Sequence, residues 1–448
     1  SSPSRRRLLS EHEMRARRMV LEYHGTRRSL ADFVALKDIL SGLSNLNLEA
    51  TSTQGVVKKE YNGAKDLMIV GGRPLNVSSL TFIFSSSSCG RTLTQLPMSV
   101  FNQRWLGTGA PSTAASMQLY HSVCSYNKLR FPTELNRVYG PIDLPCKGTS
   151  SKGAYALDTG CDDPELFALW DNAKKYLQKN DPAVFASLAM YRRKVMVFPF
   201  ATCNWGGLAN VGCPGSDDCT TWISPDLKDT SVDLSLVLHE LAHNIGLAHS
   251  ARVVCDSATC QFDDYGDFTD FMGSGGPNDK DGLLCLSAPQ AYKAGWSSPV
   301  AGGEFKLTDL AVGSTFDNNK FVLPAAALSD KNFLRIIVDQ GGMAVSTIRT
   351  LERALYVSFR VRQPRTPTPG YDSGLADDYN RRVFVHEFNE TADNKASDQR
   401  KPPLIQGMLD VKDSTGKSPT VKGTWGVLSD TFTYGSVAGQ NGLRIRQV

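Results

Sequence analysis

Alternation of apolar and small or β-branched residues marks the first structured part of the chain. Leu80, Phe82 and Phe84 follow this pattern after Ser79, which predicts a half-buried strand. Residues 194–200 form a second run of the same character. The two runs predict two strands that are separated by more than a hundred residues.

An amphipathic helix is predicted between these strands. Its apolar residues recur at three- and four-residue intervals and share one face. They are Leu166, Leu169, Trp170, Ala173 and Leu177. Asp163 can cap this helix, and Pro164 suits its first turn. Helices mixed with strands in this way indicate an α+β domain with a mixed sheet, which we place at residues 79–300.

The pattern changes on both sides of this region. Beyond Pro299 the chain lacks cysteine, and residues 354–361, 382–388 and 442–448 are strand-like runs separated by turn residues, so we expect a β-rich domain at residues 301–448. Residues 1–78 carry helix-like patches and Arg-rich runs, and we expect a basic helical segment that is part of a pro-region or a solvated surface.

The composition excludes some classes of protein but does not identify a function. The chain has 448 residues, 41% hydrophobic and 21% charged, as expected for a globular protein of more than one domain. A formal net charge of +4 is too small to indicate a nucleic-acid partner. No apolar run reaches the length of a membrane-spanning helix, and the sequence does not open on a signal peptide, so we expect a processed N-terminus.

Cysteine usage favours an oxidising compartment. All 10 cysteines lie between Cys89 and Cys285, in spacings that form no compact zinc cage, which predicts a disulfide-stapled domain. The triplets that begin at Asn76 and Asn389 are acceptor sequons for N-glycosylation. We therefore expect a secreted glycoprotein.

The segment with the clearest chemistry runs from His239 to His249 and reads HELAHNIGLAH. His239 and His243 are four residues apart, so on a helix both imidazoles face one metal ion, with Glu240 beside them. Gly246 can adopt the left-handed conformation that ends the helix, and the chain can then return His249 as a third ligand.

Three imidazoles suit Zn²⁺ and leave one position for water, whose pKa the metal lowers to about 7. Glu240 is placed to take a proton from that water and to deliver one to the departing amine. Because a motif with five fixed positions uses three of the 7 histidines, a chance HExxH is disfavoured. His12, His24, His121 and His386 have no such spacing, and we expect structural roles for them.

The extended motif resembles the metzincin zinc peptidases, in which a tight turn with methionine lies beneath the metal. That resemblance implies this Met-turn role for Met272. The acidic residues 263–270 just before it lack the EF-hand pattern, so we interpret them as a solvated loop and predict no calcium site.

Further landmarks resemble the gametolysin family of metzincins, the extracellular-matrix and cell-wall lytic peptidases of green algae. They are residues 124–126, 203–208, 285–290, 356–360 and 382–386, with Trp222, Gly295 and Trp296. The resemblance implies a secreted zinc metalloendopeptidase whose partners are matrix or cell-wall glycoproteins rich in proline or hydroxyproline. Residues 1–88 contain no cysteine for a cysteine switch, and Ser274 stands where some metzincins have an extra tyrosine ligand.

Two alternatives stay open at this point. Ser250, directly after the third histidine, resembles the matrixins, another secreted metzincin family with the same chemistry. The other alternative is a non-catalytic matrix or adhesive protein that retains a metal site, although an intact Glu240 argues against it.

Overall fold

The computed structural model describes the chain in eleven stretches. They are residues 17–23, 75–109, 113–211, 219–255, 260–277, 281–309, 320–339, 353–389, 402–409, 431–434 and 443–447. Within them the protein has a mixed architecture of several sheets and fewer helices, in agreement with the mixed α and β elements predicted. Residues 1–16 and 24–74 of the predicted helical segment, and residues 390–391 of the sequon that begins at Asn389, lie outside the described residues.

The first sheet has five strands in the order β5-β3-β8-β10-β9. In chain order they are β3 (Ser79–Ser85), β5 (Asn136–Asp143), β8 (Arg193–Val197), β9 (Gly207–Ala209) and β10 (Cys219–Ile223). The first four strands in the sheet order run parallel, whereas β9 pairs antiparallel with β10 at the edge. The two strands predicted from the sequence, β3 and β8, are direct neighbours.

Helices cover both faces of this sheet. They are α3 (Met98–Leu106), α4 (Met117–Cys124), α5 (Asp163–Asn180), α6 (Pro182–Ala186) and α7 (Leu234–Asn244), while α8 (Ala288–Lys293), further along the chain, packs against β16 and β17 of the second sheet. Phe82 packs in one core with α5, while Ile83 on the opposite face packs in another with α3, α4 and α7. The prediction that β3 is half-buried is therefore wrong: a central parallel strand covered on both faces is buried along nearly its whole length.

Helix α5 matches its predicted face but not its predicted cap. All five apolar residues of the predicted stripe are buried. The N-cap is Asp162 rather than Asp163, and the Asp162 N–H donates to Glu165 Oε2 over 3.0 Å, as in a capping box. The helix therefore begins with Pro164 in its first turn, where the missing N–H costs nothing.

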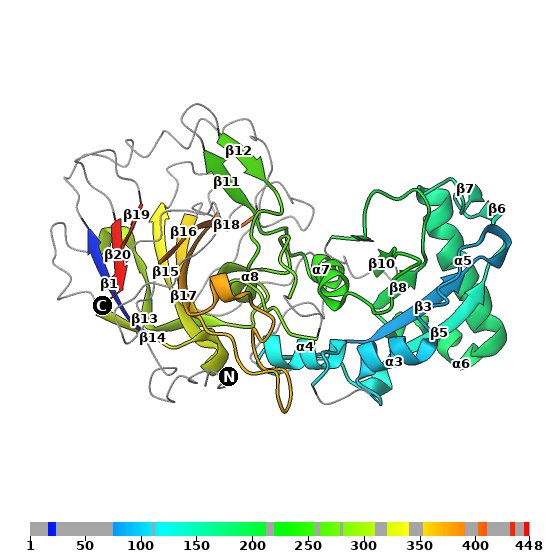
Figure 1. Ribbon diagram of the computed structural model, residues 1–448, viewed down its shortest axis with the longest axis horizontal. Helices are drawn as coiled ribbons and strands as arrows, with labels where there is room; N and C mark the ends of the chain where they lie inside the picture. The colour runs from blue at the N-terminus through cyan, green and yellow to red at the C-terminus, as the bar shows by residue number, and fades with distance from the viewer. Residues whose placement is uncertain are drawn as a thin grey trace, which may run out of the picture.

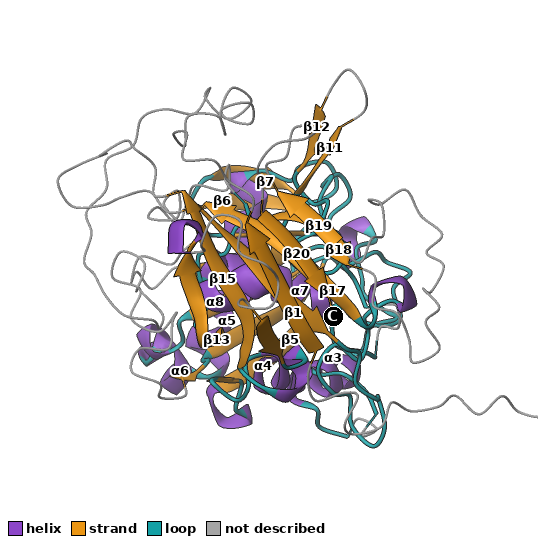
Figure 2. Cartoon of the chain, turned by 90° about the vertical axis from the view of Figure 1, so that its left-hand side faces the viewer, coloured by secondary structure: helices purple, strands orange, loops and turns teal. Residues whose placement is uncertain are grey.

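The second sheet has five strands in the order β13-β15-β16-β17-β18. They are β13 (Ser298–Lys306), β15 (Lys331–Asp339), β16 (Arg353–Arg360), β17 (Arg382–Asn389) and β18 (Leu404–Leu409), all antiparallel except the β13–β15 pair. Figure 2 shows this sheet with α7 and α8 behind it. The strand-like runs predicted at residues 354–361 and 382–388 correspond to β16 and β17.

A third sheet joins both ends of the described chain. Its order is β14-β1-β20-β19, with β1 (Arg17–Tyr23), β14 (Lys320–Leu323), β19 (Thr431–Tyr434) and β20 (Leu443–Gln447). Within the segment predicted to be helical, residues 17–23 are thus a strand. Backbone pairing with β14 and β20 on either side overrides the local helix-like pattern there.

Short elements complete the described fold. The small two-stranded sheets are β2 (Leu75–Asn76) with β4 (Leu129–Arg130), β6 (Lys147–Ser150) with β7 (Gly153–Ala156), and β11 (Arg252–Cys255) with β12 (Cys260–Asp263). The 3-10 turns are η3 (Ser87–Cys89), η4 (Thr133–Leu135), η5 (Leu188–Met190), η6 (Leu307–Asp309), η8 (Ala326–Leu328) and η9 (Asp377–Tyr379). None of the described helices combines the length and apolar character that crossing a bilayer requires.

Helices α4, α7 and α8 lie between the first and second sheets (Figure 1). The core around α7 includes Ala326 and Tyr371, so apolar contacts continue beyond residue 300. Disulfides Cys124–Cys285 and Cys161–Cys203 confirm the prediction of a stapled region, and the first ties α4 to the loop before α8. The predicted boundaries at residues 78 and 300 stay predictions.

Candidate metal centre

Helix α7 carries the first half of the histidine motif. Asp233 caps the helix, with its carboxylate accepting hydrogen bonds from the N–H groups of Ser235 and Leu236. Val237 and Leu241 anchor the helix in the core. Since His239 and His243 are one turn apart, this anchoring fixes both imidazoles on one side of α7.

The end of α7 turns the chain back toward the same place. Gly246 has a φ of 79°, in the left-handed region that glycine adopts without strain. Its N–H donates to His243 O over 2.7 Å, and the Leu247 N–H donates to Ala242 O over 3.1 Å. Together these bonds form a Schellman motif that ends the helix, with Gly246 three residues before His249.

The structure brings the three predicted ligands together. His239, His243 and His249 are the group among the described residues that could hold a metal ion, with one nitrogen from each lying within 4.8 Å of the others. All three side chains are buried. The His239 and His243 Nε2 atoms are 3.1 Å apart. Two ligands at zinc–nitrogen distances and a tetrahedral angle would be about 3.3 Å apart.

Hydrogen bonds at the far side of each ring orient these nitrogens. His239 Nδ1 lies 2.7 Å from Phe271 O, and His243 Nδ1 lies 2.8 Å from Leu247 O. His249 Nδ1 lies 2.6 Å from Asp264 Oδ2. Because carbonyl and carboxylate oxygens accept hydrogen bonds, each Nδ1 carries a proton, and Nε2 is the nitrogen of each ring that is left to bind a metal ion.

Electrostatics favour a cation at the centre of this group. Burial lowers the pKa of His239 to about 4 and that of His243 to about 3, so both rings are neutral near pH 7. Two Nε2 lone pairs that face each other over 3.1 Å without a proton between them repel. A metal ion removes that repulsion, and neutral imidazoles held by hydrogen bonds at Nδ1 are the donors that Zn²⁺ accepts.

Glu240 lies beside the histidines without belonging to their group. Its side chain is 5% exposed, and burial raises its pKa to about 8. The carboxylate lies against Gly207 of β9, where a Cβ would stand 2.4 Å from Glu240 Oε1. The close approach of this glycine backbone therefore fixes the carboxylate between α7 and the edge strand.

Met272 is fully buried in the core that includes α7. The residue before it, Phe271, supplies the carbonyl that orients His239. Met272 O accepts a hydrogen bond from the Ser250 N–H over 2.8 Å, directly after the third histidine. The segment around Met272 thus supports the backbone of one ligand and the ring of another.

The acidic residues before Met272 correct the interpretation as a solvated loop. Asp267 and Asp270 are both 0% exposed. Asp263 pairs with Arg252, Asp264 with His249, and Asp267 with His386, while Asp270 accepts the Met272 N–H. Buried carboxylates need such partners, and only the fold brings them together. His386 has the hydrogen-bonded structural role expected for it.

Sequence reasoning missed Asp264 and Tyr265 as parts of this centre. The Tyr265 ring centroid lies 4.0 Å from that of His249 and 5.9 Å from that of His239, stacked on the latter. Ser274, two residues after Met272, donates its N–H to Tyr265 O over 2.7 Å. A tyrosine therefore lies at the histidines although position 274, two residues after Met272, is serine. The sequence signal for Tyr265 was the acidic run in which it stands.

Comparisons with known proteins agree with this geometry. The sequence profile of the family described as gametolysin peptidase M11 matches residues 78–416. The chain is also similar to an autolysin of Chlamydomonas reinhardtii, with 28% identity over 456 residues that cover 87% of this chain. It spans 64% of the length of that relative. Because the family profile extends over well beyond half of the chain and encloses the whole histidine centre, the protein belongs to the gametolysin M11 family of metallopeptidases.

Proposed function

We propose that this protein is a zinc endopeptidase of the metzincin type, with His239, His243 and His249 as ligands and Glu240 as general base. The observation that carries the proposal is the convergence of three buried imidazoles, each oriented by a hydrogen bond at Nδ1. Zn²⁺ bound there would supply a Lewis acid that makes water nucleophilic near neutral pH and stabilises negative charge on a carbonyl oxygen.

Glu240 supplies the proton transfers. Ionised, it accepts a proton from the attacking water, and protonated, it delivers that proton to the nitrogen of the departing amine. Burial raises its pKa to about 8, whereas a nearby cation favours the ionised form, so the two effects oppose each other near neutral pH. The reaction needs no covalent intermediate with the protein.

The position of β9 supports an extended peptide as substrate. β9 lies at the edge of the first sheet, with β10 as its one neighbour among the described strands. A peptide strand added at that edge would use backbone hydrogen bonds, which suits substrates of varied sequence. Because Glu240 lies against Gly207 of β9, such a peptide would pass the general base.

We also propose secretion and a matrix or cell-wall glycoprotein substrate. Disulfides among the described cysteines support an oxidising compartment. Asn76, the acceptor of the first sequon, is exposed. The relative from Chlamydomonas reinhardtii is named an autolysin, which agrees with the wall or matrix substrate that the resemblance to the gametolysin family implies. Among the residues that the structure describes, no observation favours the alternative non-catalytic role.

Zinc analysis together with proteolysis tests the proposal. We expect about one zinc ion per chain and cleavage of a proline-rich matrix glycoprotein, lost on chelation and restored by zinc. The assay is run after removal of any inhibitory N-terminal segment. A chain that holds zinc but cleaves no protein would support the adhesive alternative, and a chain that binds no zinc would remove the proposed chemistry.

Replacing Gly207 by alanine is expected to lower kcat by about a hundredfold, because the new Cβ would stand 2.4 Å from Glu240 Oε1 and displace the carboxylate. Zinc content should not change. The matched control is Gly206→Ala, whose Cβ would lie near the flexible Leu236 side chain, with the shortest distance 3.1 Å to Cδ2. Equal kcat values for the two variants on a fluorogenic peptide would show that the position of Glu240 does not limit the reaction.

A further inference from the structure

The chain that carries the third histidine is hydrogen-bonded to the second sheet. Ala251, two residues after His249, forms an isolated parallel bridge with Leu404 at the start of β18. The Ala251 N–H donates to Pro403 O, and the Ile405 N–H donates to Ala251 O, both over 2.9 Å. A strand about 150 residues later in the sequence thus fixes the backbone beside a proposed ligand.

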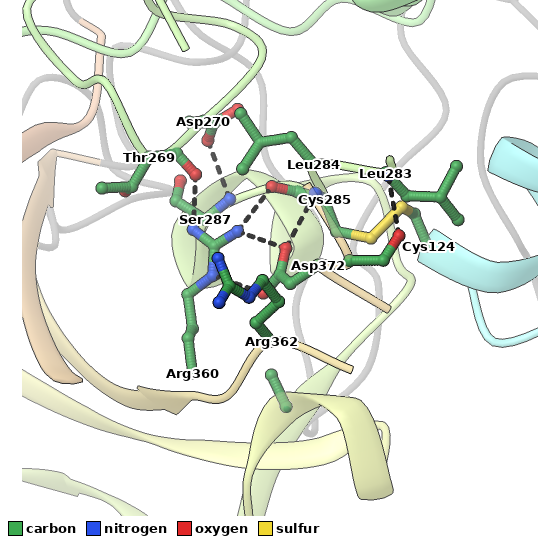
Figure 3. Close-up of polar contacts among 12 residues, drawn as sticks. Cys124, Thr269, Asp270, Leu283, Leu284, Cys285, Ser287, Arg360, Arg362 and Asp372 are labelled. Carbon is green, nitrogen blue, oxygen red and sulfur yellow. Dashed lines mark hydrogen bonds and ion pairs between the residues drawn. A yellow bond between two sulfur atoms is a disulfide. The ribbon is translucent and has the colours of Figure 1, made fainter. Parts of the chain in front are cut away.

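Arg360 makes a second connection, from the end of β16. Its side chain is 2% exposed, and its guanidinium donates to Thr269 O over 2.5 Å and to Cys285 O over 3.0 Å (Figure 3). It also forms a bidentate pair with Asp372, with distances of 2.8 Å from Nε to Oδ2 and 2.6 Å from Nη2 to Oδ1. Three segments therefore meet at one side chain.

The segment bound by Arg360 leads directly to the metal centre. Asp270, next to Thr269, accepts hydrogen bonds from the Met272 N–H over 2.9 Å and from the Ser287 N–H over 2.8 Å. Its Oδ2 atom also accepts the Ser250 hydroxyl over 3.2 Å. A displacement of Thr269 would thus move Asp270, which binds the hydroxyl of Ser250, the residue directly after His249.

A third connection reinforces the same segment. His386 Nε2, from β17, lies 3.0 Å from Asp267 Oδ2, and both side chains are 0% exposed. The Asp267 N–H donates to Ser250 O over 3.1 Å. The second sheet therefore contacts residues 267–270 through two buried side chains and contacts residue 251 through its backbone.

Stability alone does not account for this arrangement. Buried ion pairs are costly to desolvate, and apolar side chains of similar volume often give equal or greater stability. A bidentate guanidinium–carboxylate pair adds fixed direction, because the planar fork accepts few geometries. The Arg360–Asp372 pair consequently fixes where the loop of Met272 lies relative to the second sheet.

We propose that Arg360 is a positioning residue of the metal centre. It holds residues 269–272, and through Asp270 and Ser250 it holds the backbone of His249, so the second sheet forms part of the peptidase site. This inference rests on the proposed zinc site. Loss of a group that orients a ligand indirectly lowers metal affinity by about 10- to 100-fold, which sets the expected size of the effect.

The test compares two buried arginines of the second sheet. Arg360→Met removes the positioning contacts, whereas Arg335→Met removes an equally buried arginine whose partners include Glu304 and Tyr356 of that sheet. Zinc dissociation constants are measured by chelator competition on the full chain, with kcat and KM, and unfolding of the metal-free proteins is measured beside them. Arg360→Lys keeps the charge without the planar fork.

We expect zinc affinity to fall about 10- to 100-fold in Arg360→Met, to be intermediate in Arg360→Lys and to stay within about twofold of the parent in Arg335→Met. Equal affinities in both methionine variants at similar stability, or an unchanged affinity in Arg360→Met, would overturn the positioning role alone. A parent chain that binds no zinc would overturn the proposed function and this inference together. If Arg360→Met does not fold, zinc affinity is compared between Arg335→Met and the variants Arg360→Lys and Asp372→Asn. An unchanged zinc affinity in both of these variants would then overturn the positioning role.

Discussion

Replacing Glu240 by glutamine is expected to lower kcat for peptide cleavage by about a thousandfold, within the range of general acid–base catalysis. The amide keeps the size of the side chain but cannot accept a proton from water at neutral pH. The metal centre should otherwise persist, because Glu240 is not one of the three proposed metal ligands and because other residues cap and pack α7. Steady-state kinetics and zinc analysis on the same preparation measure both effects.

The zinc content decides what a loss of activity in this variant means. Loss of activity together with zinc would show that the substitution damaged the metal centre, and the general-base assignment would then lack support. Activity within about tenfold of the parent, with zinc retained, would place the base elsewhere. Only retained zinc with little activity agrees with proton transfer by the carboxylate that lies against Gly207.

The local part of the site was predictable from the sequence because helix geometry has a fixed period. Four-residue spacing places His239 and His243 on one side of α7, and Gly246 adopts the left-handed φ that its position indicated. The apolar stripe of α5 was predictable for the same reason. Each of these features depends on residues within about one turn of each other.

Contacts between residues far apart in the sequence produce no periodic pattern and could not be predicted. The partner of Asp267 is His386, 119 positions away, and nothing in either neighbourhood indicates the other. Ala251 likewise meets Leu404 across more than 150 positions. Strand β1, in a segment predicted to be helical, is defined by its pairing with β14 and β20. Such contacts depend on the folded topology rather than on local propensity.

The acidic run shows how composition misleads at a functional site. Four aspartates within eight residues are typical of an exposed loop, yet Asp267 and Asp270 are fully buried. Their burial is possible because His386, backbone N–H groups and hydroxyls satisfy the carboxylates. Charged residues are usually exposed, so these two buried aspartates beside the metal motif are an exception to the rule. Their hydrogen bonds show that they support the segment that holds the motif.

Replacing His243 by alanine is expected to abolish peptidase activity, to the level of the chelated parent, and to change the acid stability of the metal-free protein. Activity is lost because two imidazoles no longer complete a zinc site. Stability changes because His239 and His243 are held neutral, with pKa values lowered by burial to about 4 and about 3. Denaturant unfolding of the metal-free parent and variant at pH 6.5 and at pH 5 measures the second effect.

The sign follows from proton binding by the two states. Between pH 6.5 and pH 4 the unfolded chain protonates both histidines while the folded chain does not, so their stabilising contribution is complete above pH 6.5 and is lost as the pH falls. From pH 6.5 to pH 5 each histidine should reduce the free energy of unfolding by about 1.6 kcal/mol, because the unfolded histidine is already half protonated at pH 6.5. The variant lacks one of these histidines. Its free energy of unfolding should therefore fall less between pH 6.5 and pH 5, by the contribution of one histidine.

Comparing the change with pH in the two proteins removes the contributions of all groups that titrate alike in both. If the free energy of unfolding falls equally in both proteins on acidification, His243 is protonated in the folded, metal-free parent. A proton would then lie between the Nε2 atoms that are 3.1 Å apart. In that case the repulsion that favours a cation would be absent, and the electrostatic argument for zinc would fail. A smaller loss in the variant would show that the fold holds two facing lone pairs, an arrangement that a metal ion stabilises.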